Sequence, residues 1–358
     1  MVEFLNRYVS IQKEGDSSTT RAGSTGYGDE PTAGTSNLEV FGEVDSEGFA
    51  TTYELLTRAD ISRPIAAKSV TSTERSEGNV ALAVQVDDFV GNMLYAFFPQ
   101  DTTSNPSGSI YKHVLTEPSL TSATAGIYPS YTIRVGREEK EHTYTGMMAN
   151  TLSISANVGE YVMMDVGFVG KSESATGSLA TPTFDGAAID ALHFADGIVK
   201  FDDGTSTAPA ASASVKSISF EVNLNRDTDN AHAIGNSTYV RAPPAQRREI
   251  SGTIEFNKVL YGDQALDEPD YDSLVAANGL EYNDGTDAVM TLKFLDEAGA
   301  DYIEIEFFKL RFEAPTASVS GRDTNTMSVG FVGLYDDNLG AMRVTAEGTT
   351  LSSTQYDA

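Results

Sequence analysis

The sequence predicts a mainly β protein made of two tandem antiparallel β-sandwich or β-barrel modules, each with one short helix. Apolar and polar residues alternate along the predicted strands, and Gly, Asn and Asp occupy many of the turns between them. A five-residue run, Val-Gly-Phe-Val-Gly, occurs twice. Its copies are Val166, Gly167, Phe168, Val169, Gly170 and Val329, Gly330, Phe331, Val332, Gly333. Because a similar series of strands and turns precedes both copies, one β-module is predicted to be present twice.

This pattern divides the chain into five segments. Residues 1–37 mix Gly, Ser, Thr and charge with little periodicity and are expected to form a loop-rich N-terminal arm. The first β-module is expected at 38–171 and the second at 215–343. Between them, 172–214 contains stretches rich in Gly, Ala, Ser and Thr and is expected to be a linker region. The mostly polar residues 344–358 are expected to form a tail.

In the first module, the first strands are expected at 40–49 and 52–56, and a short apolar strand at 80–86. Asp87 and Asp88 follow, where a helix N-cap would lie, before a helix at 89–98. The later strands are expected at 131–135, 151–156 and 161–165, and they lead into the first copy of the repeated run.

The second module repeats this order. Alternation with period two predicts strands at 217–224 and 250–256, and a short helix is expected at 269–278. Strands are then expected at 289–294, 302–307, 309–312 and 324–328. A strand followed by a short helix therefore occupies the same place in both halves.

Composition limits the class of protein. The 358 residues are enough for two domains with real cores. The absence of cysteine excludes disulfides and thiolate metal sites. No run of about eighteen apolar residues offers a membrane span, and residues 1–6 are too short and too charged for a signal peptide. We therefore expect a soluble protein that does not use a membrane.

The chain is strongly acidic, with 52 Asp and Glu against 24 Lys and Arg and a net charge of −28. It lacks the charges for a basic face that would bind DNA phosphates. Two compatible explanations are an acidic surface suited to a salt-rich environment and an acidic wall facing something anionic that must not stick. A third explanation is an acidic protein from an environment of ordinary salt concentration.

The residue patterns favour no catalysis. The four histidines are scattered without metal-ligand spacing, and no Gly-x-Ser-x-Gly elbow is present. The acidic cluster at 263–272 lacks the central Gly and final Glu of a calcium loop. Adjacent carboxylates such as Asp87 and Asp88 would point to opposite faces of a strand, which makes a poor glycosidase pair. We expect no enzyme activity, no cofactor and no metal.

Two features are candidates for assembly. Phe168 and Phe331 are most simply core residues of their modules, and the neighbouring glycines would allow close backbone approach or a bulge; a role in assembly contacts is the alternative. The loop at 230–248 is unusually basic for this chain, with Arg241, Arg247 and Arg248. It is either a solvated loop or a contact with an acidic patch on a neighbouring subunit.

An ordered series of segments carries a family resemblance. It comprises 8–28, then 131–135 and 144–170 ending in Phe168-Val169-Gly170, then 217–225 and 247–254. This series resembles the tail tube proteins of tailed viruses: a short opening arm, paired strands closed by a Phe-x-Gly turn, and the other half of the module. The likeness covers most of 53–336 apart from the linker region. No single motif in it is diagnostic.

The resemblance implies a fold of tail-tube type and a structural virion protein that forms stacked rings around a channel for genome delivery. Open sheet edges would pair with the neighbouring subunit and close an inner β-barrel through head-to-tail contacts. Since the family channel has sixfold character, two modules per chain imply a pseudo-hexameric trimer, with a hexamer as the rival.

The resemblance also implies partners and a location. The chain would contact itself and other tail proteins (tape measure, terminator and baseplate), and viral DNA would pass through an acidic lumen without specific binding. The protein would be assembled in the host cytoplasm and reside in the virion tail. The acid excess departs from many members and suggests a halophilic host.

Other functions are also compatible with the sequence. Another β-rich virion component, such as a baseplate, hub or head-decoration protein, would share this composition. A carbohydrate-binding or host-surface-binding pair of β-modules would need an exposed aromatic platform, and the chain has no tryptophan. An acidic hydrolase lacks a coherent set of residues. The inner tube of a contractile injection device would reuse the same module.

Overall fold

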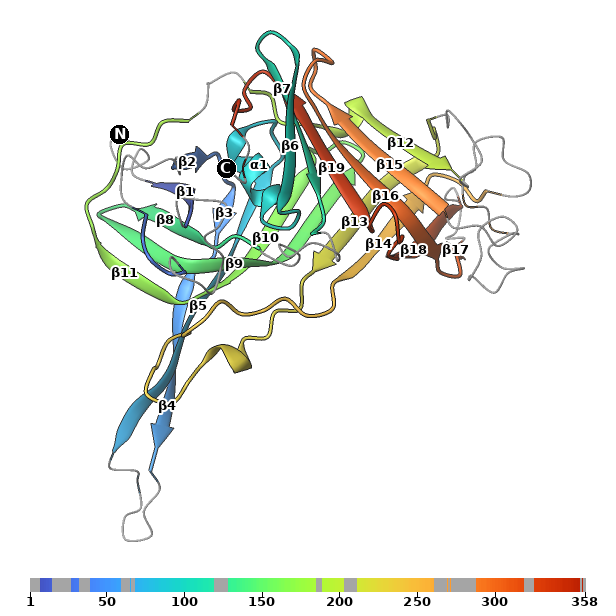
Figure 1. Cartoon of the computed structure of the whole chain (residues 1–358). Helices are drawn as coiled ribbons and strands as arrows, with labels where there is room; N and C mark the ends of the chain where they lie inside the picture. Colours follow the sequence, from blue (N-terminus) through green and yellow to red (C-terminus); the bar gives the residue numbers. More distant parts are fainter. Residues whose placement is uncertain are drawn as a thin grey trace.

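The computed structural model describes residues 7–14, 27–31, 39–58, 65, 68–118, 128–184, 189–202, 211–260, 269, 271, 288–318, 325–354 and 356. Within these ranges the chain forms nineteen strands and one α-helix, and every strand pairing is antiparallel (Figure 1). The predicted mainly β, antiparallel class is confirmed.

The strands of the first half are β1 (Arg7–Lys13), β2 (Val40–Gly42), β3 (Ser46–Glu47), β4 (Ala50–Thr57), β5 (Ser69–Ala83), β6 (Gln100–Ser107), β7 (Ile110–Thr116), β8 (Tyr131–Arg137), β9 (Lys140–Asn157), β10 (Met163–Gly170) and β11 (Ser172–Gly177). Those that follow are β12 (Gly197–Asp202), β13 (Val215–Asn223), β14 (Glu249–Phe256), β15 (Ala288–Leu295), β16 (Tyr302–Phe312), β17 (Thr316–Ser318), β18 (Thr326–Gly333) and β19 (Met342–Gly348). Several expected strands are therefore parts of longer ones, as at β5 and β16.

One sheet runs through both halves of the molecule. Its strand order is β4–β5–β10–β9–β13–β14–β18–β17, and β3 continues β4 in the same register. The long strand β9 also enters a second sheet, where its first part pairs with β8 and β11. In the second half, β12, β15, β16 and β19 form the corresponding second layer, which β7 and β6 of the first half extend. The main hydrophobic core lies between the layers and contains buried residues of both halves, such as Leu152 and Phe307, and a smaller buried cluster includes Tyr27 and Tyr239.

The helix α1 (Asp88–Tyr95) confirms the expected N-cap. The Asp87 carboxylate accepts a hydrogen bond from the Val90 backbone N–H at 2.7 Å, which satisfies one of the free donors of the first turn. Phe89 and Met93 are buried beneath it. Of the helix expected at 269–278, only Pro269 and Tyr271 belong to the described residues.

The expected N-terminal arm is wrong where it covers β1. This strand pairs with β8 on one side and β2 on the other, and its residues Tyr8 to Gln12 are buried. The polar residues that hide this strand from a search for apolar periodicity have hydrogen-bond partners. Ser10 donates to the Glu39 carboxylate, and the Gln12 side-chain oxygen accepts from Arg134. A buried strand can hold such residues because their hydrogen bonds are satisfied.

The linker region and the tail also contain strands. β11 and β12 lie within 172–214, and β12 forms a full ladder with β15. The residues expected as a tail begin inside β19, which lies between β16 and β7. Leu351 and Tyr356 are buried after it. Since β19 is paired on both sides, the residues at the start of the expected tail are part of the fold.

The two halves share their strand-pairing registers. Phe168 lies opposite Ala149, and Phe331 lies opposite Phe312, so both partners are shifted by 163 residues. The β8–β9 and β15–β16 ladders are matched in the same way, and each has its irregularity at the same place, after Tyr131 and after Ala288. The pairs β5–β10 and β14–β18 correspond as well.

Candidate assembly surfaces

The repeated run forms two strands in corresponding positions. In β10, Val166 and Phe168 face the core and are buried, as are Val329 and Phe331 in β18. The Phe168 ring lies 6.2 Å from that of Phe49, centre to centre. A Cβ at Gly170 would collide with the Met147 sulfur, so this glycine permits the close approach of β9.

The other face of the continuous sheet carries small polar and acidic residues. Cross-strand pairing brings Asp165, Ser153, Glu221 and Ser251 into one row across β10, β9, β13 and β14. The remaining positions of this face include Glu77, Asn79, Thr151, Ser155, Ser219, Thr253, Glu255, Ser328 and Gly330. Asn79 donates to the Asp165 carboxylate at 2.8 Å, and Lys216 pairs with Glu255 at 2.9 Å. We call this surface the acidic face.

The continuous sheet ends in two edges. Among the strands that the structure describes, β4 pairs only with β5, and β17 pairs only with β18. Ala50 and Thr52 on the first edge and Thr316 on the second are exposed. Figure 1 places β4 and β17 on opposite sides of the molecule. Unpaired strand edges are templates for pairing with another chain.

A long hairpin projects from the body (Figure 1). It is formed by β4 and the first part of β5 and carries the exposed side chains of Tyr53, Leu55 and Val70. The loop that joins β13 to β14 runs beside it, and the Glu74 N–H donates to the Ser237 carbonyl at 2.8 Å. Exposed apolar side chains gathered on one projection are typical of an interaction surface.

Two of the three loop arginines remain available to a partner. Arg241 and Arg247 are exposed, although the Arg241 Nε also donates to the Asn230 carbonyl at 3.2 Å. Arg248 does not fit the expected contact with another subunit. Its guanidinium pairs with Glu117 at 2.5 Å, and the two side chains are only 14% and 11% exposed.

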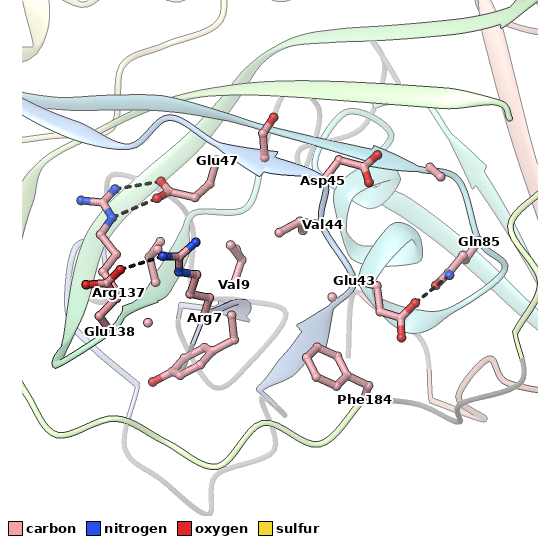
Figure 2. Close-up of a pocket in the computed structure, with 16 residues that line it drawn as sticks. Arg7, Val9, Glu43, Val44, Asp45, Glu47, Gln85, Arg137, Glu138 and Phe184 are labelled. Carbon is pink, nitrogen blue, oxygen red and sulfur yellow. Dashed lines mark hydrogen bonds and ion pairs between the residues drawn. The ribbon is translucent and has the colours of Figure 1, made fainter. Parts of the chain in front are cut away.

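An open cavity lies beside β3 and has a volume of about 750 Å³ (Figure 2). Figure 2 shows two ion pairs in it, Arg137 with Glu47 and Arg7 with Glu138, at 2.8 and 2.6 Å. Phe184 lies on its opposite side. Glu43 and Asp45 also line the cavity, and Glu43 accepts a hydrogen bond from Gln85 at 3.1 Å, so the recess next to the β4 edge is polar and carries an excess of carboxylates.

His113 is buried and has a carboxylate partner. His113 Nδ1 lies 2.8 Å from the Asp101 carboxylate, and its Nε2 lies 3.0 Å from the Ser352 carbonyl oxygen. Burial lowers the pKa of His113, but the hydrogen bond and charge of Asp101, together with the Ser352 carbonyl and the Asp88 charge, outweigh it and leave the pKa raised. Both ring nitrogens have partners, and the Tyr356 ring stacks on the imidazole at 4.4 Å. The His113–Asp101 pair therefore anchors the segment that contains Ser352 and Tyr356.

Other chemistry is limited in the same ranges. No group of three His, Asp or Glu side chains that could hold a metal ion occurs among the described residues. The acidic cluster at 263–272 lies almost wholly outside them. The only described α-helix, α1, has eight residues, and no helix in the described part of the chain is long and apolar enough to cross a bilayer.

The fold and these surfaces define a class of protein: a β-rich protein whose described strands leave two unpaired sheet edges and a projecting hairpin. A family model of the phage tail tube protein matches residues 20–333. The chain therefore belongs to the phage tail tube protein family, which is structural rather than enzymatic, and its place is the virion tail. No curated protein matches the chain. Family membership implies self-assembly into a tube and contact with other tail proteins.

Proposed function

We propose that the protein forms stacked rings that enclose a channel for delivery of the viral genome. The observation that carries this proposal is the continuous eight-strand sheet, with one face in the core and the other acidic. Such a sheet can form a ring wall because its two edges lie on opposite sides of the subunit. The acidic face would then line the channel.

The matched registers of the two halves support an internal duplication and a trimeric ring. Three copies, each with eight strands, would supply a barrel of twenty-four strands. With a strand spacing of about 4.8 Å and a tilt of about 40°, its backbone diameter would be roughly 48 Å. This leaves room for hydrated duplex DNA after the side chains are counted. A hexamer that used one module per chain for its wall would not employ both matched halves.

An acidic lining suits passage of DNA. Carboxylates at Asp165 and Glu221 would repel phosphates, and there would be no counterion release to favour binding. Small residues such as Ser153 and Ser251 keep the surface smooth. DNA would thus slide through the channel without a specific site.

The projecting hairpin and the loop beside it would make the contacts along the tube axis. Both lie at the same end of the continuous sheet, where they can reach the next ring. The apolar side chains of Leu55 and Val70 would be covered there, and Arg241 and Arg247 would meet acidic groups of the next subunit. Tape measure, terminator and baseplate proteins are the further partners that we propose, with assembly in the cytoplasm of a halophilic host.

Electron microscopy of the purified protein in molar salt tests this function. Hollow tubes or stacked rings whose end views have threefold or pseudo-sixfold symmetry are the expected result. Strict sixfold rings would retain the tube and refute the trimer. A monomer that binds a sugar in a glycan screen and never polymerises would refute the channel.

A further inference from the structure

The repeat in the strand pairing predicts how neighbouring subunits join. Within the chain, the second half is attached to the first by the β9–β13 ladder, in which Ser153 lies opposite Glu221. Each half has the same strand order, so each has one edge like that of β9 and one like that of β13. In a single chain, two of these four edges pair with each other and two are left over.

The first unpaired edge is the counterpart of β13. Val80 and Ile254 correspond, because they lie opposite Val166 and Val329 of the repeated run. Their partners on the next strand are Glu47 and Ile218. Three residues further along both strands, Ala50 is therefore the counterpart of Glu221.

The second unpaired edge is the counterpart of the last part of β9. Ser153 lies opposite Asp165, and Thr316 lies opposite Ser328. Asp165 and Ser328 each stand directly before the first valine of the repeated run. Thr316 in β17 is therefore the counterpart of Ser153.

We propose that, in the assembled ring, β17 of one copy pairs antiparallel with the β3–β4 edge of the next copy, with Thr316 opposite Ala50. This inference rests on the proposed ring and specifies its junction. The internal β9–β13 ladder and the new ladder would then alternate around the ring in the same register. The cavity beside β3 would lie next to this junction.

Two local features affect the backbone hydrogen bonds of the proposed ladder. Pro315 stands directly before β17, has no N–H and removes one backbone hydrogen bond at the start of the new ladder, a position where proline is tolerated. In the single chain the Phe49 N–H donates to the Glu47 carboxylate at 3.0 Å, and its carbonyl accepts from Arg137 at 2.7 Å. Ring closure would exchange these side-chain bonds for backbone bonds. Until then they cover part of the edge and limit unwanted pairing.

The register gives a sharp test, because the chain contains no cysteine. In the β9–β13 ladder the Val158 N–H donates to the Lys216 carbonyl, so alternation makes Ser153 and Glu221 a non-hydrogen-bonded pair. Thr316 and Ala50 would form the same kind of pair, with Cα atoms about 4.5 Å apart, which suits a disulfide.

The experiment compares A50C/T316C with the matched control T52C/T316C in assembled tubes under mild oxidation. All three positions are exposed, so the substitutions should leave the subunit folded. Thr52 is displaced by two residues from the predicted register, at a diagonal distance of about 7–8 Å that disfavours a bond. We expect at least about tenfold more covalent multimer for A50C/T316C on non-reducing gels.

Each outcome is informative. A covalent ladder that stops at three chains supports the junction and the trimer, and one that stops at six supports the junction and refutes the trimer. Tubes visible by microscopy in which A50C/T316C links no better than the control overturn the junction and leave the tube intact. A wild-type protein that forms no ring under any salt condition overturns both. Mixed A50C and T316C chains should give dimers only.

Discussion

Replacement of Arg248 should destabilise the subunit itself, whereas replacement of the adjacent Arg247 should not. Arg248 pairs with Glu117 at 2.5 Å and donates to the Phe97 carbonyl at 2.8 Å and to the Tyr128 hydroxyl at 3.0 Å. Arg248→Ala leaves a nearly buried carboxylate without its cation, a loss in the range of about 3–5 kcal/mol. In this variant Glu117 still accepts a hydrogen bond from the Ala341 N–H at 3.2 Å. We therefore expect a loss in the free energy of unfolding at the lower end of this range, about 3 kcal/mol.

Urea unfolding of the single subunit in molar salt, followed by circular dichroism, measures this difference. Arg247 is exposed, so Arg247→Ala is the matched control and should change the free energy of unfolding by less than about 0.5 kcal/mol. Equal unfolding midpoints for the two variants would refute the internal role of Arg248. Arg247→Glu then becomes the variant that tests the proposed contact between rings, because it should shorten tubes without unfolding the subunit.

Three further predictions concern the fold and its conditions. Asp87→Ala should lower the free energy of unfolding by about 1 kcal/mol through loss of the N-cap of α1, and a wild-type value would contradict it. The pKa of His113 is raised in the folded chain, so the stabilisation from its bond to Asp101 should be fully present below its unfolded pKa of about 6.5 and should fade as the pH rises through the folded pKa; His113→Asn should abolish this slope in unfolding curves taken across pH. If the acid excess reflects a salt-rich host, circular dichroism should show loss of structure as salt falls below roughly 1 M, and full structure at low salt would exclude that host.

Local patterns predicted much of the β architecture. Strict alternation identified β13 and β14, and Asp87 before an apolar run identified α1. The strands that were missed carry polar residues whose partners are distant in sequence. Gln12 in β1 bonds to Arg134, and Arg343 in β19 pairs with Glu306 at 2.6 Å. A sequence window shows the polar residue but not the partner that makes its burial acceptable.

The assembly surfaces were less accessible to sequence reasoning for a related reason. Charge along the loop made Arg241, Arg247 and Arg248 look alike, whereas only the fold brings Glu117 to Arg248. Unpaired edges are properties of long-range pairing, so β17 and β4 could be identified as edges only from the ladders of the described strands. The repeated run nevertheless pointed to the strands whose matched registers define those edges.

The β9–β13 ladder has a consequence for the concentration at which tubes form. Because this junction lies within one polypeptide, its formation does not depend on encounter between molecules. In the proposed trimer, half of the junctions are therefore made when the chain folds, and ring closure brings together three bodies instead of six. By mass action, the equilibrium ring concentration would rise with the third power of free subunit rather than the sixth. A virus that fuses two modules can thus build its tail from a more dilute pool of protein.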